Sequence, residues 1–132
     1  MSQLSIALLS MQKNSKFAKA YRDGINKKNY WEFFLEDSLD LISKIPRVAS
    51  IIYNNVFKNR RATPIADPKL NLSQNFVHMM GHTNNPGLVN LISHYLVLHS
   101  DHEGGNVSAH ATQLVGSALS DPYLSYSAGL NG

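Results

Sequence analysis

The feature that most constrains the fold is a long apolar stripe in residues 30–57. Apolar side chains recur there at spacings of three and four residues, the repeat of one face of an α-helix. These side chains are Leu35, Leu39, Ile42, Ile45, Ala49, Ile52 and Val56. Pro46 lies inside the segment, and because the stripe keeps its phase across it, we expect a kink near 42–46 and not a break. The sequence therefore predicts one long helix with a buried stripe.

Two shorter helices are predicted before this segment, and a loop after it. Residues 4–11 are apolar nearly all round, which is typical of a buried helix. Phe17 and Tyr21 lie four residues apart on one helix face, and Gly24 ends that pattern. Residues 59–72 contain two prolines and are predicted to form the main loop.

Cap residues and prolines mark the helices of the second half. Ser73 is predicted to cap a short helix that reaches Met80 and is closed by Gly81. Two pairs place a cap residue before a first-turn proline: Asn85-Pro86 before 87–98, and Asp121-Pro122 before the last helix. Between them, residues 107–119 are rich in Ala, Ser and Gly, which predicts a helix buried between others.

The fold class that follows is all-α, a multi-helical bundle, because no segment alternates with a period of two. A chain of 132 residues can bury roughly two-thirds of its unfolded surface. Charged residues make up 16%, below the usual share of about 25%, so we expect much of the surface to be covered. The chain has no cysteine, no apolar run of about 20 residues for a membrane span, and no visible targeting signal.

Positive charge is confined to the first half of the chain. All 12 Lys and Arg residues lie between Lys13 and Lys69, spaced among acids and without an aromatic platform. This pattern favours a solvated surface, so nucleic acid is set aside as a partner. After Lys69 the charged residues are Asp101, Glu103 and Asp121.

Polar and charged side chains are most concentrated in residues 99–108, which have the sequence HSDHEGGNVS and lie between two helical patterns. Two histidines and two acids there raise the possibility of a metal. Zinc sites of the HEXXH type need a second histidine four residues after the first, but Asn106 stands four residues after His102. His78 and His82 are four apart but are interrupted by Gly81. Metal binding is therefore set aside, and His78, His82, His94 and His110 are assigned ordinary capping or core roles.

The same residues suit an anion. Gly104-Gly105 permits unusual backbone conformations, Asn106 is a good N-cap, and a helix beginning at Val107 would direct free N–H groups toward His102. The alternative is a tight corner between helices, in which His102 only bonds a backbone carbonyl. The residues alone leave both interpretations open.

Four stretches in this order carry a family resemblance: residues 29–32 (NYWE) with 36–38 (EDS), residues 75–81, residues 99–110, and residues 116–125 (GSALSDPYLS). Together they resemble the citrate synthases, in the branch found in mitochondria. The resemblance runs along the whole chain. It implies an internal part of the large helical domain of that enzyme, with the small domain and the C-terminal part absent.

The resemblance also implies the site. His102 would donate a hydrogen bond to oxaloacetate, which binds before acetyl-CoA, and Asn106 and Ser108 would line the same pocket. Asp101 and Glu103 would orient histidine or cap helix ends. The arginines that a dianion needs are absent from this half of the chain. In the family they come from later sequence and from the second subunit.

The reaction that the resemblance implies is the condensation of acetyl-CoA with oxaloacetate and water to citrate and CoA, in the tricarboxylic acid cycle. It uses two histidines and an aspartate as acid and base, without a metal or other cofactor. In the family these catalytic residues follow the stretch matching 128–132, so we expect none within this chain and no activity from it alone.

The partners follow from the same resemblance. Family members pair as homodimers through helices that match residues 4–11, 31–57 and 121–132, and they act in the mitochondrial matrix. An alternative from another class is a non-catalytic helical module for self-association or scaffolding. It predicts a stable folded dimer in isolation, whereas a part of an enzyme would expose contiguous apolar area and aggregate.

Overall fold

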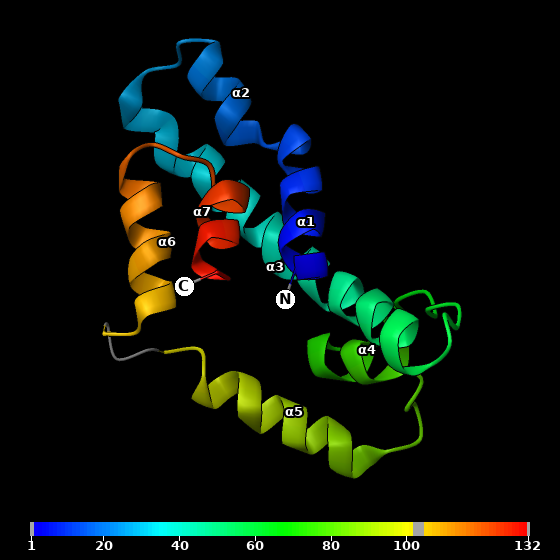
Figure 1. Cartoon of the computed structure of the whole chain (residues 1–132). Helices are drawn as coiled ribbons and strands as arrows, with labels where there is room; N and C mark the ends of the chain where they lie inside the picture. The colour runs from blue at the N-terminus through cyan, green and yellow to red at the C-terminus, as the bar shows by residue number, and fades with distance from the viewer. Residues whose placement is uncertain (1, 102–104, 132) are drawn as a thin grey trace. The chain divides into compact units, whose positions relative to one another are not determined.

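The computed structural model describes residues 2–101 and 105–131 (Figure 1). Over these residues the chain is helical and contains no strand, which confirms the all-α prediction. The elements are α1 (Ser2–Met11), η1 (Gln12–Asn14), α2 (Lys16–Arg22), η2 (Lys27–Asn29), α3 (Tyr30–Phe57), α4 (Leu72–Met79), α5 (Pro86–Leu98), α6 (Val107–Ser117) and α7 (Pro122–Gly129). None of the described helices is both long enough and apolar enough to cross a membrane.

The chain divides into two compact units. The first unit comprises Met1–Ser43 and Glu103–Gly132, and the second comprises Lys44–His102. Helix α3 contributes its first part to one unit and its remainder to the other. It runs through Pro46 without a break, as predicted, and Ser50 Oγ donates to the Pro46 carbonyl at 2.7 Å. The kink beside Pro46 stays a prediction.

In the first unit, a buried carboxylate joins α2 to α3. Asp37, on α3, is fully buried and accepts hydrogen bonds from Ser15 Oγ (2.6 Å), Lys16 N (2.9 Å) and Phe17 N (3.0 Å). Ser15 is also the N-cap of α2, because its Oγ accepts from Ala18 N. Asp37 therefore satisfies the amide donors that the first turn of α2 leaves without a helical partner.

Aromatic rings complete the contact between α2 and α3. The Phe17 ring meets Tyr30 and Phe34 edge to face, with both pairs of ring centroids 5.5 Å apart, and it also lies near Tyr21. This geometry is favourable for aromatic pairs. The contact between Phe17 and Tyr21 confirms their predicted common helix face.

Helix α7 contacts both α1 and α6 (Figure 1). Asp121 caps α7 by accepting from Tyr123 N and Leu124 N, and it also accepts from Gln12 Nε2 at 2.9 Å. Ser5 Oγ and Ser127 Oγ lie 2.9 Å apart, which ties α1 to the later part of α7. The buried residues of α7 are Pro122, Tyr123, Ser125, Ser127 and Gly129.

The second unit is held by side-chain amides. Asn54, a buried side chain of α3, donates from Nδ2 to Met79 O (3.0 Å) and to Thr63 Oγ1 (3.1 Å). Asn75 bonds the backbone of Asp67 and Leu70, so the loop before α4 is fastened to the helix that follows it.

The cap of α4 differs from the prediction. Asn71, not Ser73, is the N-cap, and it forms a capping box with Gln74, which returns a bond to the Asn71 amide. Ser73 lies inside the helix and is buried. The capping box decides between the two candidates. Gln74 stands three positions after Asn71, whereas no Gln or Glu stands three positions after Ser73.

Two helix ends confirm the glycine predictions. Gly24 and Gly81 adopt φ of 70° and 85°, and each follows a helix end. His82 N bonds Val77 O and Gly81 N bonds His78 O, the pattern of a Schellman motif after α4. The left-handed backbone explains why the helices stop at these residues.

The burial predictions were wrong for three helices. Leu35, Leu39, Ile42 and Val56 of the predicted stripe are exposed, and the buried side chains of α3 are instead Asp37, Leu41, Ser50 and Asn54. In α1 only Leu8 is buried, and α6 has no buried residue. Within the described chain the predicted stripe of α3 is thus exposed or half-buried, and three of the four buried side chains of the helix are polar.

Candidate functional site

The polar segment of residues 99–108 stands between α5 and α6 in the sequence, and within it His102, Glu103 and Gly104 lie outside the described residues. On the α5 side, His99 is the C-cap. Its Nδ1 lies 2.9 Å from Tyr95 O, and because a carbonyl only accepts, Nδ1 carries the proton in this bond. The His99 ring stacks on Tyr95 with centroids 4.0 Å apart. Asp101 is exposed.

On the α6 side, two predicted site residues are joined directly. Asn106 is the N-cap of α6, as predicted, and its Oδ1 accepts from Ser108 N at 2.9 Å. Ser108 Oγ also donates to that oxygen. Asn106 is exposed and Ser108 half-buried. The structure thus brings Asn106 and Ser108 into one hydrogen-bonded group.

This arrangement leaves groups that can bind an anion. The Oδ1 atom of Asn106 accepts the hydroxyl proton of Ser108, so the Nδ2 donors of Asn106 remain for an anion, and Ser108 Oγ can accept from a water. The positive end of the α6 dipole lies at the same place. No Lys or Arg follows Lys69 in the sequence, so the full charge of a dianion must be matched by groups from elsewhere.

Helix α7 packs against the first turn of α6, which carries Ser108. The sequence did not predict this particular contact. Thr112 Oγ1 donates to Ser108 O at 2.9 Å. A methyl group on Gly129 of α7 would overlap with Thr112 Oγ1 and lie 2.8 Å from Ser108 O. The backbone of α7 therefore lies directly against the first turn of α6.

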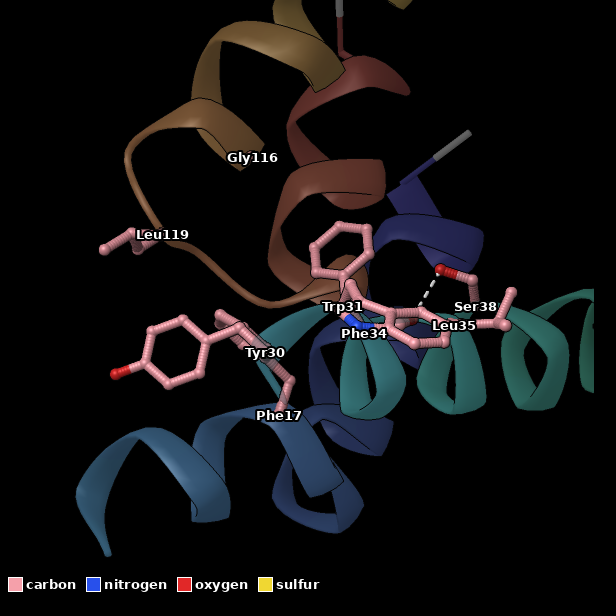
Figure 2. Close-up of a pocket in the computed structure, with 8 residues that line it drawn as sticks. All are labelled: Phe17, Tyr30, Trp31, Phe34, Leu35, Ser38, Gly116 and Leu119. Carbon is pink, nitrogen blue, oxygen red and sulfur yellow. Dashed lines mark hydrogen bonds between the residues drawn. The ribbon is translucent and has the colours of Figure 1, made fainter. Parts of the chain in front are cut away.

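An apolar hollow in the first unit is a different kind of site. It has a volume of about 360 Å³. Figure 2 shows its lining, which is Phe17, Tyr30, Trp31, Phe34, Leu35, Ser38, Gly116 and Leu119. The hydroxyl of Ser38 is already bonded to Phe34 O at 2.8 Å, and no lining side chain is charged. This hollow is suited to apolar side chains and not to a dicarboxylate.

A second hollow, of about 370 Å³, lies in the second unit. It is lined by Leu70, Gln74, His78, Thr83, Asn84, Pro86, Val89 and Asn90. His78 lies 3.2 Å from Ile65 O through Nε2 and 3.0 Å from Thr83 Oγ1 through Nδ1. Because the carbonyl requires a proton on Nε2, Nδ1 of a neutral His78 accepts from Thr83, and both ring nitrogens are engaged.

The other histidines also have ordinary partners. His82 Nε2 lies 3.2 Å from the hydroxyl of Tyr53, and His94 Nδ1 lies 2.7 Å from Asn90 O. His110 is exposed, and its backbone amide bonds Asn106 O in the first turn of α6, so its predicted capping or core role stays a prediction. Across residues 2–101 and 105–131, no three side chains of the types His, Cys, Asp or Glu are grouped as a metal site would require.

The described residues define an all-helical protein in which a polar segment of the sequence precedes a capped helix N-terminus suited to an anion. Comparison with known proteins gives the particular family: the family model described as "Citrate synthase, C-terminal domain" matches residues 1–132, and the chain belongs to the citrate synthase family.

Three relatives show how far the similarity extends. The chain is 59% identical to "Citrate synthase, mitochondrial" of Tetrahymena thermophila and 54% identical to "Probable citrate synthase, mitochondrial" of Glossina morsitans morsitans. It is 52% identical to "2-methylcitrate synthase, mitochondrial" of Yarrowia lipolytica. Each match covers 100% of this chain and 28% of the relative, so the chain spans less than a third of the proteins it resembles.

Proposed function

We propose that this chain supplies part of the oxaloacetate pocket of a citrate synthase, the enzyme that condenses acetyl-CoA with oxaloacetate and water to citrate and CoA. The observation that carries the proposal is the match of the family model to residues 1–132. The chain would form part of the large helical domain of that enzyme. It would act in the mitochondrial matrix, since several relatives are named as mitochondrial.

Three residues are proposed to line the site of oxaloacetate. His102 would donate a hydrogen bond to it, Asn106 would direct its Nδ2 amide to the same ligand, and Ser108 would orient Asn106 or a bound water. The bonds that Asn106 Oδ1 accepts from Ser108 support this role, because they fix the direction of the amide. The exposed position of Asn106 at the positive end of α6 is also suitable for a carboxylate.

The chemical step is proposed to depend on two histidines and an aspartate outside these 132 residues, without a metal or other cofactor. The isolated chain would then release no CoA from acetyl-CoA in the presence of oxaloacetate. Release of CoA by the purified chain would contradict the proposal.

The test is a hybrid enzyme, in which this chain replaces the matching 133 residues of the Tetrahymena relative. We expect the hybrid to produce CoA from acetyl-CoA and oxaloacetate. In the hybrid, His102→Ala should raise the KM for oxaloacetate by about a hundredfold, the cost of about 2–3 kcal/mol for a charge-assisted bond. A folded but inactive hybrid would refute the proposal and favour a scaffold, and an unchanged KM would remove His102 from the site.

We also propose that the enzyme is a homodimer, with α1, α3 and α7 at the interface. The support is the exposed apolar face of α3, where Leu39 and Ile42 are 58% and 56% exposed, together with exposed Ile6 and Leu9 on α1. Such a face is costly in water and is typical of an interface. Leu124 is the exposed apolar residue of α7, whose other face is already buried within the chain.

A further inference from the structure

The backbone of Gly129 makes a close approach to the first turn of α6. A methyl group at this position would lie 2.8 Å from the Ser108 carbonyl oxygen, closer than a carbon atom can approach. The same methyl group would overlap with Thr112 Oγ1, the hydroxyl that bonds Ser108 O. Gly129 is buried and helical, so the close contact, and not a left-handed backbone, is what requires glycine there.

We propose that Gly129 is a positioning residue for the oxaloacetate site. It lets α7 pack against Ser108 O and Thr112 Oγ1, and this contact fixes the first turn of α6 and with it Asn106 and Ser108. The inference rests on the proposed function, because Asn106 and Ser108 matter for oxaloacetate only if the chain forms that pocket.

The contacts of the two helices determine whether α6 or α7 moves when a methyl group is added at Gly129. Helix α7 is anchored at both ends: Asp121 accepts from Gln12 Nε2 at 2.9 Å, and Ser127 Oγ lies 2.9 Å from Ser5 Oγ. The start of α6 is free by comparison, since Val107 is 69% exposed. An added methyl group at Gly129 therefore displaces the turn that carries Asn106 and Ser108 more than it displaces α7.

The test is Gly129→Ala in the hybrid enzyme. Because misplaced binding groups weaken substrate binding first, we expect the KM for oxaloacetate to rise about tenfold, while kcat and the KM for acetyl-CoA change less than about twofold. The matched control is Gly116→Ala, at the same contact between α6 and α7. Its methyl group would meet Ser125 Oγ at 3.5 Å, an ordinary contact, so all three constants should stay unchanged.

A second substitution should rescue the first. Threonine carries two heavy atoms on Cβ, which restricts its rotation in a helix, whereas serine has a single Oγ that can turn away more easily. In the Gly129→Ala background, we expect Thr112→Ser to lower the KM for oxaloacetate most of the way back to its original value. The inference is overturned if Gly129→Ala lowers the melting temperature without a selective rise in this KM, or if Gly116→Ala raises it equally.

If the Gly129→Ala variant does not fold, Thr112→Val is used to test the inference instead. It keeps the side-chain volume and removes the hydrogen bond to Ser108 O. A rise of about threefold or more in the oxaloacetate KM is expected, and an unchanged KM overturns the inference. Failure of the proposed function looks different, because the hybrid with the native segment would then be folded and inactive before any substitution.

Discussion

The buried and the exposed side chains of α3 have the opposite polarity from what hydropathy suggests. The buried ones are Asp37 and Leu41 in the first unit and Ser50 and Asn54 in the second, whereas Leu39 and Ile42 are exposed. The polar side chains are buried because each has partners within the chain. Asp37 caps α2, Asn54 bonds the end of α4, and Ser50 bonds its own helix.

This difference separates two kinds of interaction. Buried polar groups need directional partners, and α3 finds them a short distance away along its own chain. Apolar side chains need only a dry surface, which another subunit can supply as well as the same chain. The buried polar side chains thus help to specify how the chain folds, and the exposed apolar ones form the surface for which an interface is proposed above.

The largest expected effect comes from charging the exposed face. In the hybrid enzyme, the double variant Leu39→Asp with Ile42→Asp should shift the dimer to monomer. Two uncompensated charges at an interface raise its dissociation constant by about a thousandfold or more. Sedimentation velocity over a range of concentrations measures the shift.

The control for this pair is Ile65→Asp. Ile65 is 81% exposed in the loop before α4, outside the proposed interface, so the hybrid should remain a dimer. If the double variant also remains a dimer with unchanged affinity, the exposed apolar side chains of α3 do not form an interface, and their exposure then has no explanation in dimer formation.

The next largest effect is expected at Asp37, the buried carboxylate of α3. Asp37→Ala leaves Ser15 Oγ and the amides of Lys16 and Phe17 without an acceptor, at a cost of about 3 kcal/mol. Amide hydrogen exchange in the first turn of α2 should then accelerate about a hundredfold. Mass spectrometry of peptides that cover residues 15–22 measures this rate.

The neighbouring acid provides the matched control. Glu36 is exposed and pairs with Lys16 at 2.7 Å. Because solvent screens an exposed pair, Glu36→Ala should leave exchange in α2 almost unchanged. Equal acceleration in both variants would mean that loss of negative charge, and not loss of the buried acceptor, loosens α2.

Local signals explain which parts of the fold could be predicted. The extent of α3 and the caps Asn85, Asn106 and Asp121 depend on residues close in sequence, and the structure confirms them. The cap at Asn71 was also within reach, since the Asn71-to-Gln74 spacing of a capping box is visible in the sequence. Ser73 is a cap residue by type alone, and the box with Gln74 is what selects Asn71.

The burial of α3 and the support of α6 could not be predicted in this way. Asp37 is buried because α2 directs three donors at it from 20 to 22 residues away, and no periodicity contains that information. Likewise, Gly129 and Ser108 meet only when two helices pack. At the candidate site the sequence predicted the Asn106 cap but not its bond to Ser108 Oγ or the contact with α7.

The smallest expected effect concerns the ion pair on the solvent side of α3. The hydrogen bond and the charge of Glu36 raise the pKa of Lys16 above its usual 10.5. A raised pKa stabilises the fold below the usual value, and this contribution is lost as the pH rises through the pKa of the folded state. Glu36→Gln removes the charge, so the pKa of Lys16 should fall toward 10.5, as measured by carbon-13 NMR titration. An unchanged pKa would show that Asp40 and Asp37, the weaker contributors, keep the pKa of Lys16 raised. The exposed Glu36 and the buried Asp37 would then differ less in their effect on Lys16 than the order of the contributions implies.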